Sequence, residues 1–454
     1  MLTLPEIVSL DSHAGFVRIP PELDVPLTDR VRRIIDTESF RRLAKMTQVG
    51  LVSLVYPAAR HTRFEHSLGV YRLALLFLKR LSHVPRFMET VSRKDAELLI
   101  VTALLHDIGH WPFCHLIEDI RIDGLPHHEE LAAGILRYGE TATCLRNDWN
   151  VEPESVIKLL SGNHSGNDPV IGLLSSILSG PIDIDKMDYL FRDSLHAGVP
   201  YGRNLDQARL IGSLCVNESG SGLAITEKGK TAAELMIFAR YVMFSEVYWH
   251  HTVRAATAML QRLFTELYRE GRIELTRFFE WTEDEAVRFF MESSQKMPTQ
   301  SLAEGLFGTK RLIYKRVAQF SILEQPEIYR KLAGQPYHQL CELSDQLSAI
   351  LSGNKPPFAV LIDAPPIEKE VEIKIDVFYP KQNCYRALEN ISPVVRAMAR
   401  EQFDDYTKRV RIFAHPAVTV SPQENQQMID FLVNKKIGTS TDQKFPGVPF
   451  LEQK

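Results

Sequence analysis

The stretch Ala103-Leu-Leu-His-Asp-Ile-Gly-His-Trp-Pro-Phe-Cys-His115 is dense in side chains that can bind a metal or move protons. It follows an apolar run at helical spacing that starts at Lys94, and Gly109 and Pro112 interrupt the helical pattern. We expect a buried helix that ends where four such residues begin: His106, Asp107, His110 and His115. An adjacent His and Asp offer a nitrogen and an oxygen ligand, which suits Zn, Fe, Mn or Ni. The alternative is that a histidine near a helix end serves only the core or the helix cap.

A second polar group stands immediately before another apolar helix. It reads Ala59-Arg-His-Thr-Arg-Phe-Glu-His-Ser-Leu-Gly69, and apolar residues recur from Val70 to Leu81. His66 is therefore expected near the start of a core helix, with Arg63 one turn earlier. A helix N-terminus beside an arginine is a natural place for a phosphate. The alternative is a surface ion pair between Arg63 and Glu65.

A third group, Gly180-Pro-Ile-Asp-Ile-Asp-Lys-Met-Asp-Tyr-Leu-Phe-Arg-Asp193, places four aspartates on one short helical stretch. Asp185, Tyr189 and Arg192 would share one face of that helix. So many like charges oppose one another unless a cation, Lys or Arg compensates them. The alternative is a salt-bridged surface helix, but the intervening residues are too apolar for a solvated element: Ile182, Ile184, Met187, Leu190 and Phe191.

The composition is that of a globular protein without a global field for nucleic acid. The chain has 454 residues, of which 44% are apolar and 24% charged, and its formal net charge is −4. Strong nucleic-acid binding is therefore not expected. Five scattered cysteines without a C-x-x-C pattern indicate reduced thiols. We expect a cytoplasmic protein with no membrane partner, because the sequence has neither a secretory leader nor an apolar stretch of membrane-spanning length.

The periodicity predicts a mainly α protein with a smaller α+β region near the C-terminus. We assign residues 1–334 to a helical core with a helical extension, 335–435 to the α+β region and 436–454 to a disordered tail. The expected elements include a strand at 16–19, a loop-rich stretch at 139–170 with one helix near 156–160, a hairpin at 214–226, one long helix at 232–268, a helix at 310–316, strands at 371–377 and 410–414, and a helix at 392–400.

The three groups together give one ligand order, His66, then His106-Asp107, then Asp185, that no local motif could supply. This order resembles the HD-domain metal-dependent phosphohydrolases. The sequences R-F-E-H-S-L-G-V, L-L-H-D-I-G-H-x-P-F-x-H and I-D-I-D-K-M-D-Y-L-x-R-D closely resemble the deoxynucleoside triphosphate triphosphohydrolases, which include bacterial dNTPases and the vertebrate SAM-and-HD-domain enzyme. The similarity runs from about residue 10 to 253, continues weakly at 310–320 and returns at 370–415.

The resemblance implies an HD-domain helical core and metal-dependent hydrolysis of dNTPs to deoxynucleoside and tripolyphosphate. It implies one divalent transition metal (Zn, Fe, Mn or Ni), with Mg a candidate for the substrate phosphates. The metal ligands that it implies are His66, His106, Asp107 and Asp185. The catalytic residues that it implies, which would serve water attack and leaving-group protonation at the α-phosphate, are His115, His128, Glu118 and His110.

Substrate contacts follow from the same resemblance. Arg63 and His110 would contact the α-phosphate, while Lys186 and Tyr189 would reach the β- and γ-phosphates. The residues implied for the sugar 3′-hydroxyl and for the lining of the pocket are Gln48 and Asp193, and Trp249 and His251, respectively. Because relatives form dimers and tetramers, the resemblance also implies a homo-oligomer.

The sequence departs from the family pattern at several positions. Leu10 and Ala44 replace an Asn and an Arg that help to read a regulatory guanine, and of that trio only Asp36 remains. Arg411 nevertheless matches a basic allosteric position. Trp111 replaces a Gly, which would narrow the pocket.

These departures keep two other functions open. One is an HD phosphohydrolase that acts on a nucleoside monophosphate or a cyclic nucleotide. The other is a nucleotide-sensing assembly in which catalysis is incidental. The products formed from a nucleotide panel distinguish the three.

Overall fold

The computed structural model describes residues 4–12, 15–122, 124–162, 168–366, 374–398 and 407–435. Helices dominate these residues and the sheets are small, which confirms the predicted fold class. The chain forms two compact units that alternate along the sequence. Unit 1 comprises Met1–His110, His128–Phe244 and Val371–Phe403, and unit 2 comprises Trp111–His127, Ser245–Glu370 and Asp404–Lys454. The division at residue 334 stays a prediction, and the predicted tail at 436–454 lies outside the described residues.

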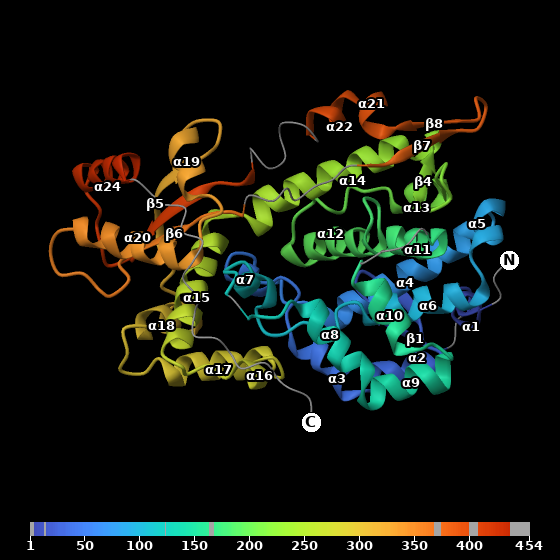
Figure 1. Ribbon diagram of the computed structural model, residues 1–454, viewed down its shortest axis with the longest axis horizontal. Helices are drawn as coiled ribbons and strands as arrows, with labels where there is room; N and C mark the ends of the chain where they lie inside the picture. Colours follow the sequence, from blue (N-terminus) through green and yellow to red (C-terminus); the bar gives the residue numbers. More distant parts are fainter. Residues whose placement is uncertain are drawn as a thin grey trace. The chain divides into compact units, whose positions relative to one another are not determined.

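Unit 1 is a helical bundle with two small sheets (Figure 1). Its helices are α1 (Pro5–Ser9), α2 (Asp29–Ile35), α3 (Glu38–Arg42), α4 (Arg63–Leu81), α5 (Pro85–Thr90), α6 (Arg93–Leu105), α8 (His128–Arg137), α9 (Gly139–Trp149), α10 (Pro153–Leu160), α11 (Pro169–Ser179), α12 (Ile184–Ala197), α13 (Gln207–Ser213), α14 (Lys230–Met243), α21 (Leu388–Ile391) and α22 (Pro393–Ala397). Its strands are β1 (Phe16–Ile19), β2 (Leu23–Pro26), β3 (Leu214–Val216), β4 (Leu223–Thr226), β7 (Asp376–Tyr379) and β8 (Cys384–Ala387).

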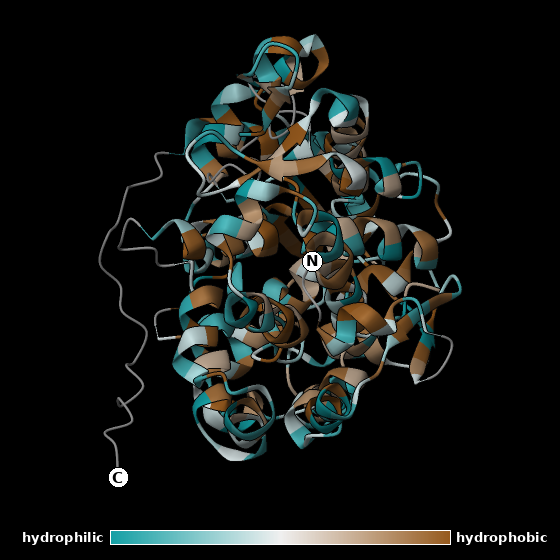
Figure 2. Ribbon diagram, turned by 90° about the vertical axis from the view of Figure 1, so that its right-hand side faces the viewer, coloured by the Kyte–Doolittle hydropathy of each residue, from teal (hydrophilic) through white to brown (hydrophobic). Residues whose placement is uncertain are grey.

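Three capped helices form the centre of unit 1. Thr62 caps α4 by accepting a hydrogen bond from the backbone N–H of Glu65, Ser92 and Asp95 form a capping box at α6, and the Asp183 carboxylate caps α12. Helix α4 packs against both α6 and α12. Hydrophobic and hydrophilic residues alternate along the helices in Figure 2, as expected where one side of each helix is buried.

The sheets of unit 1 are short. Strands β1 and β2 form an antiparallel hairpin, and the second sheet has the order β3-β4-β7-β8. Its β4–β7 pair is parallel, with Ala224 opposite Asp376, although these residues are far apart in sequence. The strand at 16–19 and the hairpin at 214–226 are confirmed.

Unit 2 packs helices against a three-stranded sheet. Its helices are α7 (Cys114–Glu118), α15 (His251–Arg269), α16 (Leu275–Phe278), α17 (Glu283–Ser293), α18 (Gln300–Phe307), α19 (Pro326–Leu332), α20 (Tyr337–Ile350) and α24 (Pro422–Asn434). Its sheet has the order β5 (Lys315–Phe320), β9 (Val410–Ala414) and β6 (Val360–Asp363), all antiparallel. Among the described residues, no helix is both long and apolar enough to cross a membrane.

Several sequence predictions of local structure are wrong. The predicted helix at 232–268 is two helices, α14 and α15, separated by a π-helical turn at 244–248. The predicted helix at 310–316 is irregular up to Tyr314 and then enters strand β5. Helix α9 lies in the stretch predicted to be loop-rich. Periodicity failed at 232–268 because a continuous and a broken helix share one apolar pattern, and at 310–316 because a short apolar run fits both a helix and a strand.

Candidate active site

The His106-Asp107 pair lies where α6 ends, as predicted. His106 is the C-cap residue, and its Nδ1 lies 2.9 Å from the carbonyl oxygen of Ala103. This contact fixes the tautomer with hydrogen on Nδ1, so Nε2 presents a lone pair away from the helix. Arg42 holds the following turn by donating from Nη2 to the carbonyl oxygens of His110 (2.8 Å) and Ile108 (3.3 Å).

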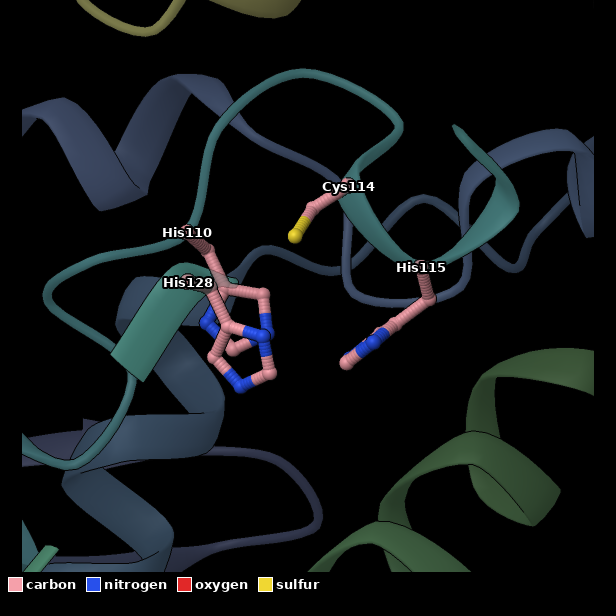
Figure 3. Close-up of side chains that lie close together, drawn as sticks. All are labelled: His110, Cys114, His115 and His128. Atoms are coloured by element: carbon pink, nitrogen blue, oxygen red, sulfur yellow. The ribbon is translucent and has the colours of Figure 1, made fainter. Parts of the chain in front are cut away.

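A glycine lets helix α8 approach this turn. A Cβ atom on Gly109 would lie 2.1 Å from the carbonyl oxygen of His128 and 2.5 Å from the backbone nitrogen of Ala132, both on α8. The close approach brings the rings of His110 and His128 to a centroid distance of 4.1 Å (Figure 3). Of the four predicted catalytic residues, these two are therefore brought together within unit 1.

Three of the predicted metal ligands converge from α4, the end of α6 and α12. One ligand atom from each of His66, His106 and Asp185 can be chosen so that all three lie within 4.8 Å of one another. His66 Nε2 is 3.2 Å from His106 Nε2 and 3.0 Å from Asp185 Oδ1. Two imidazole nitrogens that face each other this closely repel unless a proton or a cation lies between them.

The electrostatics favour positive charge at that point. Burial by itself lowers the pKa of His66, but hydrogen bonds to Asp185 and Asp188 raise it to about 10. Burial raises the pKa of Asp185, yet His66 and His106 bring it below its usual value. A metal cation would satisfy the same field after displacing the proton, so the donor set fits a divalent metal.

Asp107, the fourth predicted ligand, is buried beside this set. Its Oδ1 lies 3.3 Å from His106 Nε2 and 3.2 Å from His110 Nδ1, while Arg63 Nη1 donates to Oδ2 at 2.9 Å. Burial opposes ionisation, but His110, His106 and Arg63 hold the pKa of Asp107 well below its usual range. Arg63 is itself buried, so the alternative of a surface ion pair between Arg63 and Glu65 is wrong.

Helix α12 carries the residues predicted to reach the outer phosphates and the sugar. Lys186 Nζ donates to Asp183 Oδ2 at 2.5 Å. Burial raises the pKa of Asp183 to about 7, with Asp185 adding to the rise and Lys186 opposing it. Burial also raises the pKa of Tyr189, so its hydroxyl stays neutral and can donate. Ile184, Met187 and Leu190 of α12 are buried, so a solvated surface helix is excluded for this element.

The two residues predicted to bind the sugar lie on either side of His61. Asp193 Oδ1 is 2.8 Å from His61 Nε2, and the backbone N–H of Gln48 donates to the carbonyl oxygen of His61 at 2.9 Å. The side-chain oxygen of Gln48 is buried and has no hydrogen-bond partner among the described residues. A buried acceptor without a partner is costly, so it is suited to receive a hydroxyl from a ligand.

The remaining predicted site residues belong to unit 2. His115 Nδ1 lies 3.4 Å from Glu118 Oε2 on α7, which agrees with a carboxylate that orients this histidine. Trp249 is buried beneath the guanidinium of Arg254, and His251 begins α15 with its ring 4.4 Å from that of His250. Their assignment to one site with the residues of unit 1 stays a prediction.

Comparisons with known proteins identify the family of this chain. Residues 63–190 match the HD domain, and residues 205–432, half of the chain, match the HD associated region. The chain belongs to the HD-domain phosphohydrolase family. An uncharacterized protein of Methanocaldococcus jannaschii is 33% identical over 303 residues, which are 66% of this chain and 59% of that relative.

Other relatives of this HD phosphohydrolase carry more specific names. The deoxynucleoside triphosphate triphosphohydrolase SAMHD1 homolog of Dictyostelium discoideum is 28% identical over 256 residues, which are 54% of this chain and 47% of that protein. A phosphohydrolase structure from Bacteroides thetaiotaomicron has the same fold, with a TM-score of 0.66, 23% identity and coverage of 88% of this chain and 100% of that one. The chain spans little more than half the length of the first relatives that it matches.

The structure also bears on the departures from the family pattern. Trp111 is buried and packs against Phe278 and Phe279, with ring centroids 5.9 and 5.3 Å away. It is therefore a core residue of unit 2, and the narrowing of a pocket by Trp111 stays a prediction. Arg411, at the position matched to an allosteric one, is buried on β9 with Nε 3.3 Å from Gln319 Oε1.

Asp188 and Arg192, which the sequence did not assign to the site, support the candidate metal ligand His66 through its Nδ1. Asp188 Oδ2 lies 2.8 Å from His66 Nδ1, and Arg192 donates to both carboxylate oxygens of Asp188. A signal was present, because Asp188 and Arg192 follow Asp185 by three and seven positions on the same helix. The pairing with His66 depends on how α4 meets α12, and no spacing predicts that.

Proposed function

We propose that this HD phosphohydrolase hydrolyses deoxynucleoside triphosphates to deoxynucleosides and tripolyphosphate with a bound divalent metal. The observation that carries the proposal is the convergence of His66, His106 and Asp185, with Asp107 and Arg63 beside them. The relationship to the Dictyostelium SAMHD1 homolog, which is named for this activity, supports the choice of substrate.

The phosphate end of the substrate would meet fixed positive charge. When bound, the metal polarises a phosphoryl oxygen or activates a water. Arg63, already ordered by Asp107, would place its guanidinium at the α-phosphate with His110. Lys186 would exchange its contact with Asp183 for the outer phosphates, and neutral Tyr189 would donate to them. Such preorganised donors stabilise a dispersed negative charge without reorganisation.

The sugar end would be held by hydrogen bonds. Asp193 accepts from His61 and can accept a further bond from a 3′-hydroxyl, while the buried Gln48 Oε1 offers a second acceptor. An acceptor left unpaired by a ligand without that hydroxyl penalises binding. This pairing favours a nucleoside with a free 3′-hydroxyl.

Proton transfer would rest on histidines. His115, oriented by Glu118, is assigned to the water attack and to protonation of the leaving group, with His128 in support. We assign the reaction to a homo-oligomer in the cytoplasm, and the scattered cysteines without a C-x-x-C pattern support a reducing compartment.

The test is product identity. The purified protein, with its metal content measured, is incubated with each of the four dNTPs and Mn²⁺ or Mg²⁺, and products are separated by ion-pair chromatography. We expect deoxynucleoside and tripolyphosphate, and neither from an Asp107→Ala variant. Mixtures that react where single dNTPs do not would indicate an activating nucleotide.

Other products would contradict the proposal. Orthophosphate from a nucleoside monophosphate, or a ring-opened cyclic nucleotide, with all four dNTPs left intact would assign the metal site to another nucleotide. Nucleotide binding that persists with full function in Asp107→Ala would favour a sensor.

A further inference from the structure

A continuous chain of polar contacts begins at the metal-ligand candidate His66. His66 Nδ1 contacts Asp188 Oδ2 at 2.8 Å. Arg192 donates hydrogen bonds to both carboxylate oxygens of Asp188, at 2.8 and 2.7 Å. Arg192 Nη1 then donates to Glu65 Oε1 at 2.7 Å. The side chains of His66, Asp188 and Arg192 are buried and that of Glu65 is partly buried, so solvent screens the contacts among the first three least.

The same chain continues from Glu65 to the predicted sugar pocket. Glu65 Oε1 also lies 2.9 Å from His196 Nε2. The ring of His196 stacks on that of His61 at a centroid distance of 4.4 Å and an interplanar angle of 12°. His61 Nε2 contacts Asp193 Oδ1 at 2.8 Å. Glu65 is therefore the junction between a metal side and a sugar side.

The arrangement of the helices explains why one junction serves both sides. Glu65 and His66 are adjacent on α4, and Arg192 and Asp193 are adjacent on α12. His66 and Asp193 belong to predicted binding sites, whereas Glu65 and Arg192 belong to the chain of contacts that joins those sites. A shift of α4 against α12 would therefore disturb His66 and Asp193 together.

We propose that Glu65 and Arg192 are positioning residues that couple the metal site to the sugar pocket. Arg192 holds Asp188 so that it accepts from His66 Nδ1, which leaves Nε2 directed at the metal. Glu65 holds His196, and through the ring stack it holds His61 and the carboxylate of Asp193. The metal side rests on the donor geometry alone, while the sugar side also rests on the proposed function.

Three variants separate the two sides. Glu65→Gln keeps the shape of the junction but removes its charge. Asp188→Asn weakens the contact with His66 and leaves the contacts of Glu65 in place, whereas His196→Ala removes only the link from Glu65 to His61. The matched control is Glu154→Gln, which alters an exposed ion pair with Arg137. Mn²⁺ affinity is measured by titration of the metal-free protein, deoxynucleoside affinity by calorimetry with each of the four deoxynucleosides, and kcat and KM with the best dNTP.

The expected result is a pattern across the variants. Asp188→Asn and Glu65→Gln weaken Mn²⁺ binding by about tenfold or more, the range typical of groups that orient metal ligands. Glu65→Gln and His196→Ala weaken deoxynucleoside binding and raise KM several-fold, whereas His196→Ala keeps Mn²⁺ affinity within about twofold. Circular dichroism shows whether each variant folds. If Glu65→Gln does not fold, the other two variants decide the proposal: Asp188→Asn should lower the Mn²⁺ affinity, and His196→Ala should lower the deoxynucleoside affinity.

Two results would overturn the proposal. Wild-type Mn²⁺ affinity in both Glu65→Gln and Asp188→Asn would reduce the chain to a structural salt bridge. Equal losses of both affinities in His196→Ala and Asp188→Asn would show general loosening in place of two sides. If wild type binds Mn²⁺ but no deoxynucleoside, the proposed function and the sugar side fail together, and the Mn²⁺ titrations still decide the metal side.

Discussion

The carboxylate of Asp107 is charged and buried, and the groups around it stabilise that charge. Three neighbours surround its carboxylate, namely His106, His110 and Arg63, at 2.9–3.3 Å. An ionised carboxylate is costly to bury unless it is paired, and here every pairing group can also face a phosphate or a metal. The stabilisation of Asp107 and the construction of the candidate site are therefore the same set of contacts.

Replacing Asp107 by Asn should remove the metal and the activity together. The variant loses an anionic ligand and leaves Arg63 buried without its partner, so we expect the metal affinity to fall by more than the roughly 10–100-fold seen for supporting residues. Metal content after dialysis and dNTP turnover measure the two effects. Asp148→Asn, in an exposed ion pair with Arg33, serves as control. Full metal occupancy in Asp107→Asn would remove Asp107 from the ligand set.

At the scale of elements, one close approach and one helix cap determine the local geometry. Gly109 lets α8 approach the turn after α6, and the cap at Ser421 shapes the start of α24 in unit 2. In each case the turn or the cap is formed by residues that are neighbours in sequence, whereas the segment that packs against it comes from another part of the chain. Substitutions there should report on packing more than on chemistry.

Gly109→Ala should displace α8 and with it His128. The new methyl group would meet the backbone of α8 and not a flexible side chain, so we expect destabilisation of about 1–3 kcal/mol, as for overpacked cores. Urea unfolding measures it. Gly134→Ala on the same helix is the control, because its added methyl meets nothing within 4 Å and should stabilise by about 0.5–1 kcal/mol. Equal stabilities for the two variants would refute the close approach.

Glu424→Gln should make stability less sensitive to acid. Hydrogen bonds from Ser352 and Ser421 lower the pKa of Glu424 from about 4.5 to about 2. A carboxyl whose folded pKa is depressed stabilises the fold above its unfolded pKa, and that stabilisation disappears as the pH falls through the folded value. At pH 6 the wild type should therefore have a higher melting temperature than Glu424→Gln, and this difference in melting temperature should shrink between pH 5 and pH 2. Melting curves at several pH values measure this difference, with Asp430→Asn as control. A difference that does not change with pH would contradict the assignment.

At the scale of the whole molecule, metal binding and assembly are expected to govern stability. The candidate metal ligands His66, His106 and Asp185 come from α4, the end of α6 and α12 of unit 1, and these elements can present them together only in the folded state. Anything that binds the folded state alone stabilises it by mass action.

Removal of the metal should lower the melting temperature of the protein. At a metal concentration of 100 times Kd, the stabilisation is about 2.7 kcal/mol. Dialysis against a chelator should lower the transition, and added Mn²⁺ should restore it. Calorimetry of the Asp107→Ala variant should show no response to either treatment. A wild-type melting temperature that changes with neither chelator nor Mn²⁺ would mean that no metal links these helices.

The protein should also form a dimer or a tetramer. One chain has a mass of 51.8 kDa, so light scattering at micromolar concentration should give about two or four times that mass. Repeating the measurement with and without dNTP shows whether nucleotide binding promotes assembly. A single species with the mass of one chain under both conditions would contradict the prediction.

The sequence by itself determined the fold class, the central helices and the residue types of the candidate metal site. Helix periodicity and caps place α4, α6 and α12, because the hydrogen bonds and side-chain faces of a helix are set by neighbours within four positions. Periodicity failed where continuous and broken helices share one apolar pattern, as between α14 and α15.

Only the tertiary structure decided which side chains meet. The parallel pairing of β4 with β7, the contact of Asp188 with His66 and the link from Arg192 through Glu65 to His196 join residues distant in sequence. Residue spacing determines the face on which a side chain lies. It does not determine which faces pack together, because that choice depends on burying the apolar surface of all the helices at once.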